Sequence, residues 1–215
     1  EQRSRDHSAP EPGGRSYVSS AFESASAMDL ACTRFALRSI LTLGARFNLR
    51  RDVNNVVTLA ARYCFWPEPI FSRLRDFLSR RCADAPAWAD CGKLTLDEFM
   101  VRHGAWNGLY DDSTFYYFID EYVKLHGKDL LSVFQTTLAV LDQRLAKTRI
   151  RLLDNIAMLS AVLGLTDAEQ AVLLHASLCK YQRDLRPVLV DCKASSAQEA
   201  YAMLGQVLGF TAQDV

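Results

Sequence analysis

A thirteen-residue pattern that occurs twice constrains the fold of this chain more than any other feature. "DNIAMLSAVLGLT" begins at Asp154, and "EAYAMLGQVLGFT" begins at Glu199, 45 residues later. Seven of the 13 aligned positions are identical: Ala157/Ala202, Met158/Met203, Leu159/Leu204, Val162/Val207, Leu163/Leu208, Gly164/Gly209 and Thr166/Thr211. The four large apolar residues of each copy share one side of an α-helix, so each copy predicts a helix that buries this side.

Both copies close with residues suited to stop one helix and start another. Gly164 and Gly209 can adopt the left-handed conformation that ends a helix. Thr166 and Thr211 are suited to cap the following helix, and Glu169 completes a capping-box pattern in the first copy. Two interpretations remain, a true repeat or two helix ends that converged on the same residues, and both predict helical structure.

The second copy predicts a helix that the chain does not contain in full. Only four residues follow Thr211 before the sequence ends at Val215. A single helical turn is unstable by itself, because helix nucleation is costly and most helix stability comes from packing. We therefore expect the natural protein to continue beyond Val215.

Helical periodicity over most of the chain predicts an all-α fold, a multi-helix bundle or array with helix-turn-helix repeats in the C-terminal half. Helices are expected over residues 20–48, 51–65, 66–82, 94–104 and 113–126, although the tyrosines and phenylalanines of 113–126 also suit a strand. Residues 128–163 are expected to form one helix or two, with a bend or solvated face at the basic residues 144–151. Further helices are expected after caps at Thr166 and at Ser195 or Ser196.

Composition divides the chain into three parts. Residues 1–16 are polar and rich in proline and glycine, which predicts a disordered tail or linker. Residues 17–111 form an expected N-terminal helical module with an irregular loop at 82–111, and residues 112–215 form an expected C-terminal helical module that carries the 45-residue repeat. Whether the two modules share a core stays open at this level.

Charge and motifs exclude several classes of function. Lys+Arg and Asp+Glu are equal at 25 each, which argues against nucleic-acid or membrane binding over the whole surface. No apolar run reaches the roughly 18–20 residues of a membrane span, so no membrane contact is expected. The sequence contains no GxxxxGK[ST], GxGxxG or HExxH motif and no zinc-ligand spacing. We therefore expect no catalytic residue, metal ligand or cofactor within these residues.

Cysteine and histidine usage points in the same direction. The six cysteines form no CxxC pair, which predicts reduced thiols and a cytoplasmic protein, with a disulfide between Cys82 and Cys91 left open. The four histidines are widely separated, and His175 lies in an apolar helical segment. We interpret His175 as a core or boundary residue, and His126 beside Gly127 as the end of a helix.

The C-terminal part of the chain resembles the helical region upstream of the ATPase core in a family of bacterial AAA+ ATPases. The resemblance runs from Leu152 onward and is carried by Asn155, Leu163-Gly164-Leu165, Thr166 to Glu169, Ala171 through Leu178 and Ala200 through Gly209. It implies an N-terminal region that precedes a nucleotide-binding core in cis, in a protein that assembles as a homo-oligomeric ring, commonly a hexamer. The core is not in this sequence, so no ATPase residue is carried over.

Aromatic residues are the candidates for contact with a protein partner. Their density exceeds what one buried helix side uses, although core packing is the alternative. The candidates are Phe115, Tyr116, Tyr117, Tyr122 and Trp106, with Phe118 beside them and Trp66 and Trp88 near helix breaks. The sequence thus predicts a non-catalytic adaptor that binds a protein substrate, a partner or a neighbouring subunit of a larger AAA+ ATPase.

Two other functions stay open. "SSAQEAYAMLGQVLGFTAQDV" has the outline of a DNA-binding helix-turn-helix whose recognition helix begins at Thr211, with Lys180, Arg183 and Arg186 as a nearby basic patch. The third reading is an all-helical enzyme with no recognisable site. Duplex-DNA binding that weakens steeply with salt favours the regulator, hydrolytic activity favours the enzyme, and the adaptor predicts neither.

Overall fold

The computed structural model describes residues 16–18, 20–43, 63–81, 121–122, 124–182 and 195–209. Over these residues the chain forms seven helices and one pair of two-residue strands, which confirms the all-α class. The elements are β1 (Ser16–Tyr17), α1 (Ser20–Ser24), α2 (Ala27–Leu43), β2 (Trp66–Pro67), α4 (Glu68–Arg81), α7 (Gly127–Leu145), α8 (Arg151–Leu163), α9 (Asp167–Tyr181) and α11 (Ala197–Leu208). The helix expected at 94–104 and most of those at 51–65 and 113–126 lie outside the described residues.

The helix expected over 20–48 is divided into α1 and α2 by a cap at Ser26. The Ser26 Oγ accepts a hydrogen bond from the Asp29 N–H at 3.1 Å, and the Asp29 carboxylate accepts one from the Ser26 N–H at 3.1 Å. This reciprocal pair is a capping box, here with aspartate in the third position. The apolar spacing continues through both helices, so periodicity alone did not reveal the break.

A short antiparallel ribbon precedes α4. Ser16 pairs with Pro67 and Tyr17 with Trp66, so the last residue of the predicted tail lies in a strand. The prediction that Trp66 begins a helix and lines a contact surface is wrong, because Trp66 is buried and its ring packs against Phe71 at 6.5 Å between centroids. A residue before proline is biased away from the helical conformation, and α4 begins only after Pro67.

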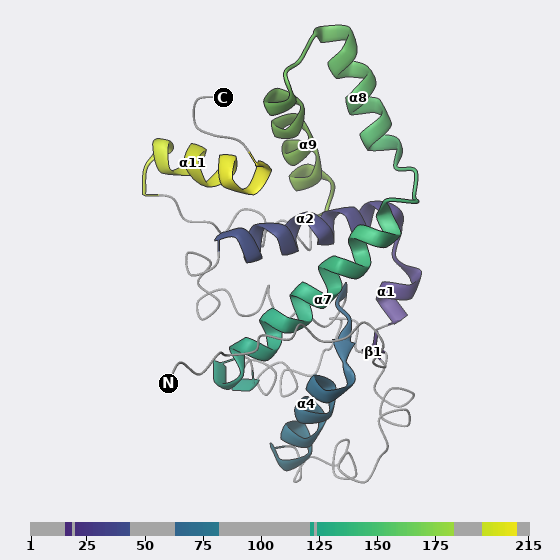
Figure 1. The fold of residues 1–215 in the computed structure, drawn as a ribbon, viewed down its shortest axis with the longest axis vertical. Helices are drawn as coiled ribbons and strands as arrows, with labels where there is room; N and C mark the ends of the chain where they lie inside the picture. The colour runs from purple at the N-terminus through teal and green to yellow at the C-terminus, as the bar shows by residue number, and fades with distance from the viewer. Residues whose placement is uncertain are drawn as a thin grey trace, which may run out of the picture.

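One hydrophobic core joins the two predicted modules. Helix α2 crosses α7 (Figure 1), and α4 with β2 packs toward the other end of α7. The contributing side chains include Leu30, Leu37 and Ile40 of α2, Phe71 and Leu74 of α4, and Val133, Phe134 and Leu141 of α7. The halves 17–111 and 112–215 therefore share a core, and the boundary between them lies outside the described residues.

The C-terminal helices extend from this core. The segment expected over 128–163 forms two helices, α7 and α8, with the turn between them at the basic stretch that includes Lys147 and Arg149. Figure 1 shows α8 and α9 side by side beyond α2, and α11 contacts both α2 and α9. Helix α8 therefore lies at the edge of the molecule, with α9 as its principal described neighbour.

The helix stop and restart expected in the first copy are present. Gly164 has φ 64° and ψ 35°, and Gly209 has φ 84° and ψ 26°. The Thr166 hydroxyl accepts a hydrogen bond from the Glu169 N–H at 3.3 Å, and the Glu169 carboxylate accepts one from the Thr166 N–H at 2.8 Å. The second copy can be followed only through Gly209, because Thr211 lies outside the described residues.

The glycine stops give a direct prediction about stability. Gly164→Ala and Gly209→Ala are each expected to lower the free energy of unfolding by about 1 kcal/mol, because an alanine is strained at positive φ. An added Cβ meets nothing within 4 Å at either site, so the cost is conformational and not a clash. Urea unfolding measures it. Gly127→Ala is the matched control, because its Cβ site is also open and its φ is not positive; an equal loss there would contradict this account.

Candidate functional site

Five large apolar side chains on α8 are exposed: Leu153, at 39%, and four others that share one side of the helix. Met158 is 64% exposed, Leu159 43%, Val162 77% and Leu163 60%. We call these four residues the α8 stripe. The sequence predicted that this side of the helix would be buried, and that prediction is wrong.

The adjacent face of α8 explains the difference. Ile156 and Ser160 are the buried residues of the helix, and Leu152 is half-buried. The three positions are four residues apart, so they lie above one another on a single face. Helix α8 is apolar around most of its circumference, and it packs against α9 while leaving the α8 stripe uncovered.

The second copy of the pattern packs the equivalent side chains. Met203 is 4% exposed, and Leu204, Val207 and Leu208 are half-buried. Helix α11 reaches α2 and α9, so its apolar side has helices to pack against. The same residues are therefore covered in one copy and open in the other, and the covered copy shows that this spacing packs well on a helical surface.

The two ends of the α8 stripe carry opposite charge. Lys147, Arg149 and Arg151 are exposed at the N-terminal end, where Arg149 forms an ion pair with Asp154 at 2.6 Å. Asp167 and Glu169 are exposed at the C-terminal end. Hydrogen bonds from the backbone and side chain of Thr166 lower the pKa of Glu169, so this acidic end stays ionised at neutral pH.

The aromatic candidates do not form a described surface. Tyr122 is buried, so the prediction that it contacts a protein partner is wrong. The centroid of its ring lies 5.4 Å from that of Phe77, and its hydroxyl donates a hydrogen bond to Asp129. The remaining candidates lie outside the described residues: Trp106, Phe115, Tyr116 and Tyr117, together with Trp88 and Phe118.

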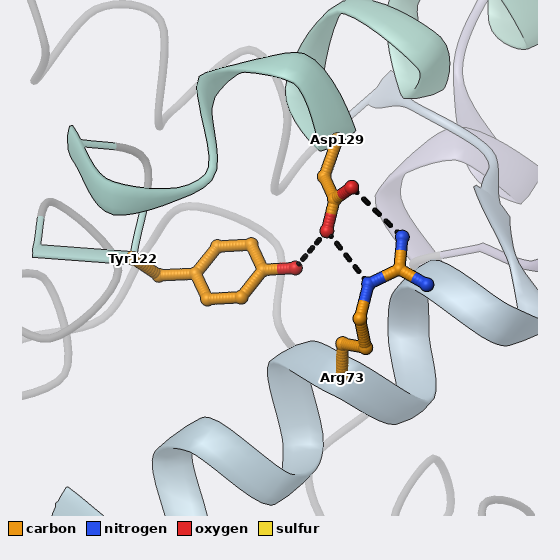
Figure 2. Close-up of polar contacts among 3 residues, drawn as sticks. All are labelled: Arg73, Tyr122 and Asp129. Atoms are coloured by element: carbon orange, nitrogen blue, oxygen red, sulfur yellow. Dashed lines mark hydrogen bonds and ion pairs between the residues drawn. The ribbon is translucent and has the colours of Figure 1, made fainter.

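Tyr122 belongs to a polar cluster that joins α4 to α7 (Figure 2). Asp129 accepts hydrogen bonds from Arg73 Nε at 2.9 Å, Arg73 Nη2 at 2.8 Å and the Tyr122 hydroxyl at 2.7 Å. Burial raises the pKa of Asp129, but the hydrogen bonds from Arg73 and Tyr122 outweigh it and hold the pKa below its ordinary value. Burial and the hydrogen bond to Asp129 raise the pKa of Tyr122. The ionised Asp129 carboxylate is thus held by Arg73 and Tyr122, and we interpret the role of the cluster as structural, joining α4 to α7.

The described cysteines have the properties of packed thiols. Cys32, Cys64 and Cys179 form no disulfide, and burial raises the pKa of Cys32 and of Cys64 to about 12. Such thiols remain protonated and are poor nucleophiles. Cys179 Sγ lies 3.7 Å from Nε2 of His175, whose ring also contacts Phe35 and whose pKa is lowered by burial. His175 is the half-buried boundary residue that the sequence predicts.

Among the described residues of this all-α protein, the α8 stripe is the most distinctive surface feature, because its apolar side chains are exposed. No family model, curated protein or solved structure matches the chain. Within the described ranges, no group of three or more His, Cys, Asp or Glu side chains is arranged to hold a metal ion. Nor does any helix there combine the length and apolarity that a membrane crossing requires.

Proposed function

We propose that this chain is a non-catalytic helical binding module that engages a protein partner through the α8 stripe. The observation that carries the proposal is the exposure of Met158, Leu159, Val162 and Leu163 on one helix. Contiguous exposed apolar side chains mark interaction sites, because leaving them in water forgoes about 1.5–3 kcal/mol for each side chain that could be fully buried.

The spacing of the α8 stripe favours a helix as the occupant. Residues one, four and five positions apart present a ridge that fits along a second helix. The packed side of α11, where Met203 is buried against helical neighbours, supports the same interpretation.

The resemblance of the residues from Leu152 onward supports a place for this module before the ATPase core of an AAA+ protein. In that setting the α8 stripe would recruit a substrate or a neighbouring subunit to the core. A phosphate-loop motif encoded downstream of Val215 would support this placement. The DNA-binding alternative depends on Arg183, Arg186 and a helix after Thr211, all outside the described residues.

A photo-crosslinking amino acid placed at Met158 tests the proposal. Leu125 is the matched control, because it is a similarly exposed apolar residue (62%) outside α8. With an isotope-labelled chain in extract from its source, we expect position 158 to crosslink to a defined helical peptide of another polypeptide and position 125 not to do so.

Binding of the identified peptide to the purified chain then gives the quantitative check. Val162→Asp places a charge at the most exposed position of the α8 stripe, and we expect it to weaken binding at least about tenfold. Crosslinks from position 158 that stay within one molecule, or equal crosslinking at 125, would contradict the proposal.

A further inference from the structure

We infer that the partner of the α8 stripe is a second copy of this chain, related by a two-fold axis that sets the two α8 helices antiparallel. The inference rests on the proposed function and names its partner. Its basis is the charge at the two ends of the helix: Arg151 is exposed at one end and Asp167 just beyond the other.

An antiparallel pair brings these ends together. With the axis between Met158 and Leu159, Asn155 of one copy lies opposite Val162 of the other, and Arg151 lies opposite the turn that leads to Asp167. Both ends of the pair then join a basic group to an acidic one. A parallel pair would instead place Arg151 beside Arg151 and Asp167 beside Asp167, and like charges across an interface are costly.

The distribution of residues also suits a self-complementary interface. Such an interface uses the same patch on both subunits, with apolar side chains at its centre and charged residues at its rim. The α8 stripe has this order, from Arg151 through the four apolar residues to Asp167. One helix side is smaller than the roughly 800 Å² per partner of a standard interface, so the dimer is expected to be weak and concentration-dependent.

Sedimentation equilibrium of the whole chain, from low micromolar to near-millimolar concentration, is the experiment. We expect a monomer–dimer equilibrium for the natural sequence, at least about tenfold weaker association for Val162→Asp or Met158→Gln, and unchanged association for Leu125→Asp. Circular dichroism and the urea midpoint of each variant check that it folds.

A charge exchange tests the orientation. Arg151→Glu and Asp167→Arg should each impair dimerisation, because each homodimer then opposes two like charges. An equimolar mixture of the two variants should dimerise, since the introduced glutamate of one chain then faces the introduced arginine of the other while the natural pair is kept at the opposite end. The double variant should also dimerise. The double variant decides the orientation: a parallel pair of it would still place like charges together at positions 151 and 167, whereas the mixture of single variants would associate in either orientation.

Several results would overturn the inference. A chain that stays monomeric throughout the concentration range contradicts it. A dimer that Val162→Asp leaves unchanged, a mixture that shows no rescue, or a double variant that does not dimerise also contradicts it. Crosslinking from position 158 to a different protein contradicts the inference that the partner is a second copy, but it agrees with the proposed function. Crosslinking that stays within one molecule contradicts both the inference and the proposed function.

Discussion

Replacing Phe134 with alanine is expected to lower the free energy of unfolding by about 3–5 kcal/mol. Phe134 is fully buried in α7, within the core where α7 packs against α2. Its removal loses the transfer free energy of a large apolar side chain and leaves a cavity that rigid neighbours fill only in part. Urea unfolding followed by circular dichroism measures the loss.

Met158→Ala is the control for that substitution. It also removes a large apolar side chain from a helix, but one that is 64% exposed, so the expected change is within about 0.5 kcal/mol. A loss comparable to that of Phe134→Ala would show that Met158 is packed inside the chain. The α8 stripe would then be part of the core and not a binding surface.

Asp129→Asn is expected to destabilise the protein by about 1–3 kcal/mol at neutral pH. The substitution keeps the shape of the side chain but removes the charge that Arg73 and the Tyr122 hydroxyl both contact. Arg73 is half-exposed and finds water as a substitute, whereas Tyr122 is buried and loses a charged acceptor. Urea unfolding at neutral pH measures the difference.

The effect of Asp129→Asn should depend on pH in one direction. The pKa of Asp129 is lower in the folded protein than its ordinary value of 3.8, so ionisation stabilises the fold. This contribution is complete above the ordinary pKa and is lost as the pH falls through the lowered one. The gap between the natural sequence and Asp129→Asn should therefore close below about pH 4.

Tyr122→Phe distinguishes the contribution of the Tyr122 hydroxyl from that of Arg73, the other donor to the Asp129 carboxylate. It removes the tyrosine hydroxyl and should cost about 1 kcal/mol, while Arg73 continues to pair with Asp129 and the pH dependence is kept. If the gap between the natural sequence and Asp129→Asn stayed constant down to acidic pH, the pairing of Asp129 with Arg73 would not be what stabilises the junction of α4 and α7.

Local chemistry made the helical class and several helix ends predictable. Gly164 ends α8 through its own backbone conformation, and Thr166 caps α9 through a hydrogen bond with Glu169, three residues away. Both helix ends therefore follow from residue type. The division between α7 and α8 was left open by periodicity, although the basic residues that mark it were visible.

Burial was harder to predict, because it depends on what lies across from a side chain. Ile156 is buried and Val162 is the most exposed residue of the α8 stripe, yet the two side chains have nearly the same chemistry. Apolar residues extend around most of α8, and only the position of α9 decides which of them are buried. Tyr122 was misjudged for a related reason: its partners Asp129 and Phe77 come from two other helices.

Met158 and Met203 provide the most direct test, because they are equivalent positions of the repeated pattern in opposite environments. Met158 is 64% exposed and Met203 is 4% exposed. In dilute solution, mild peroxide should oxidise Met158 quickly and leave Met203 largely intact, since sulfoxide formation follows exposure. At concentrations where the chain associates, Met158 should become protected. Equal oxidation rates at the two methionines, or faster oxidation of Met203, would contradict an open α8 stripe.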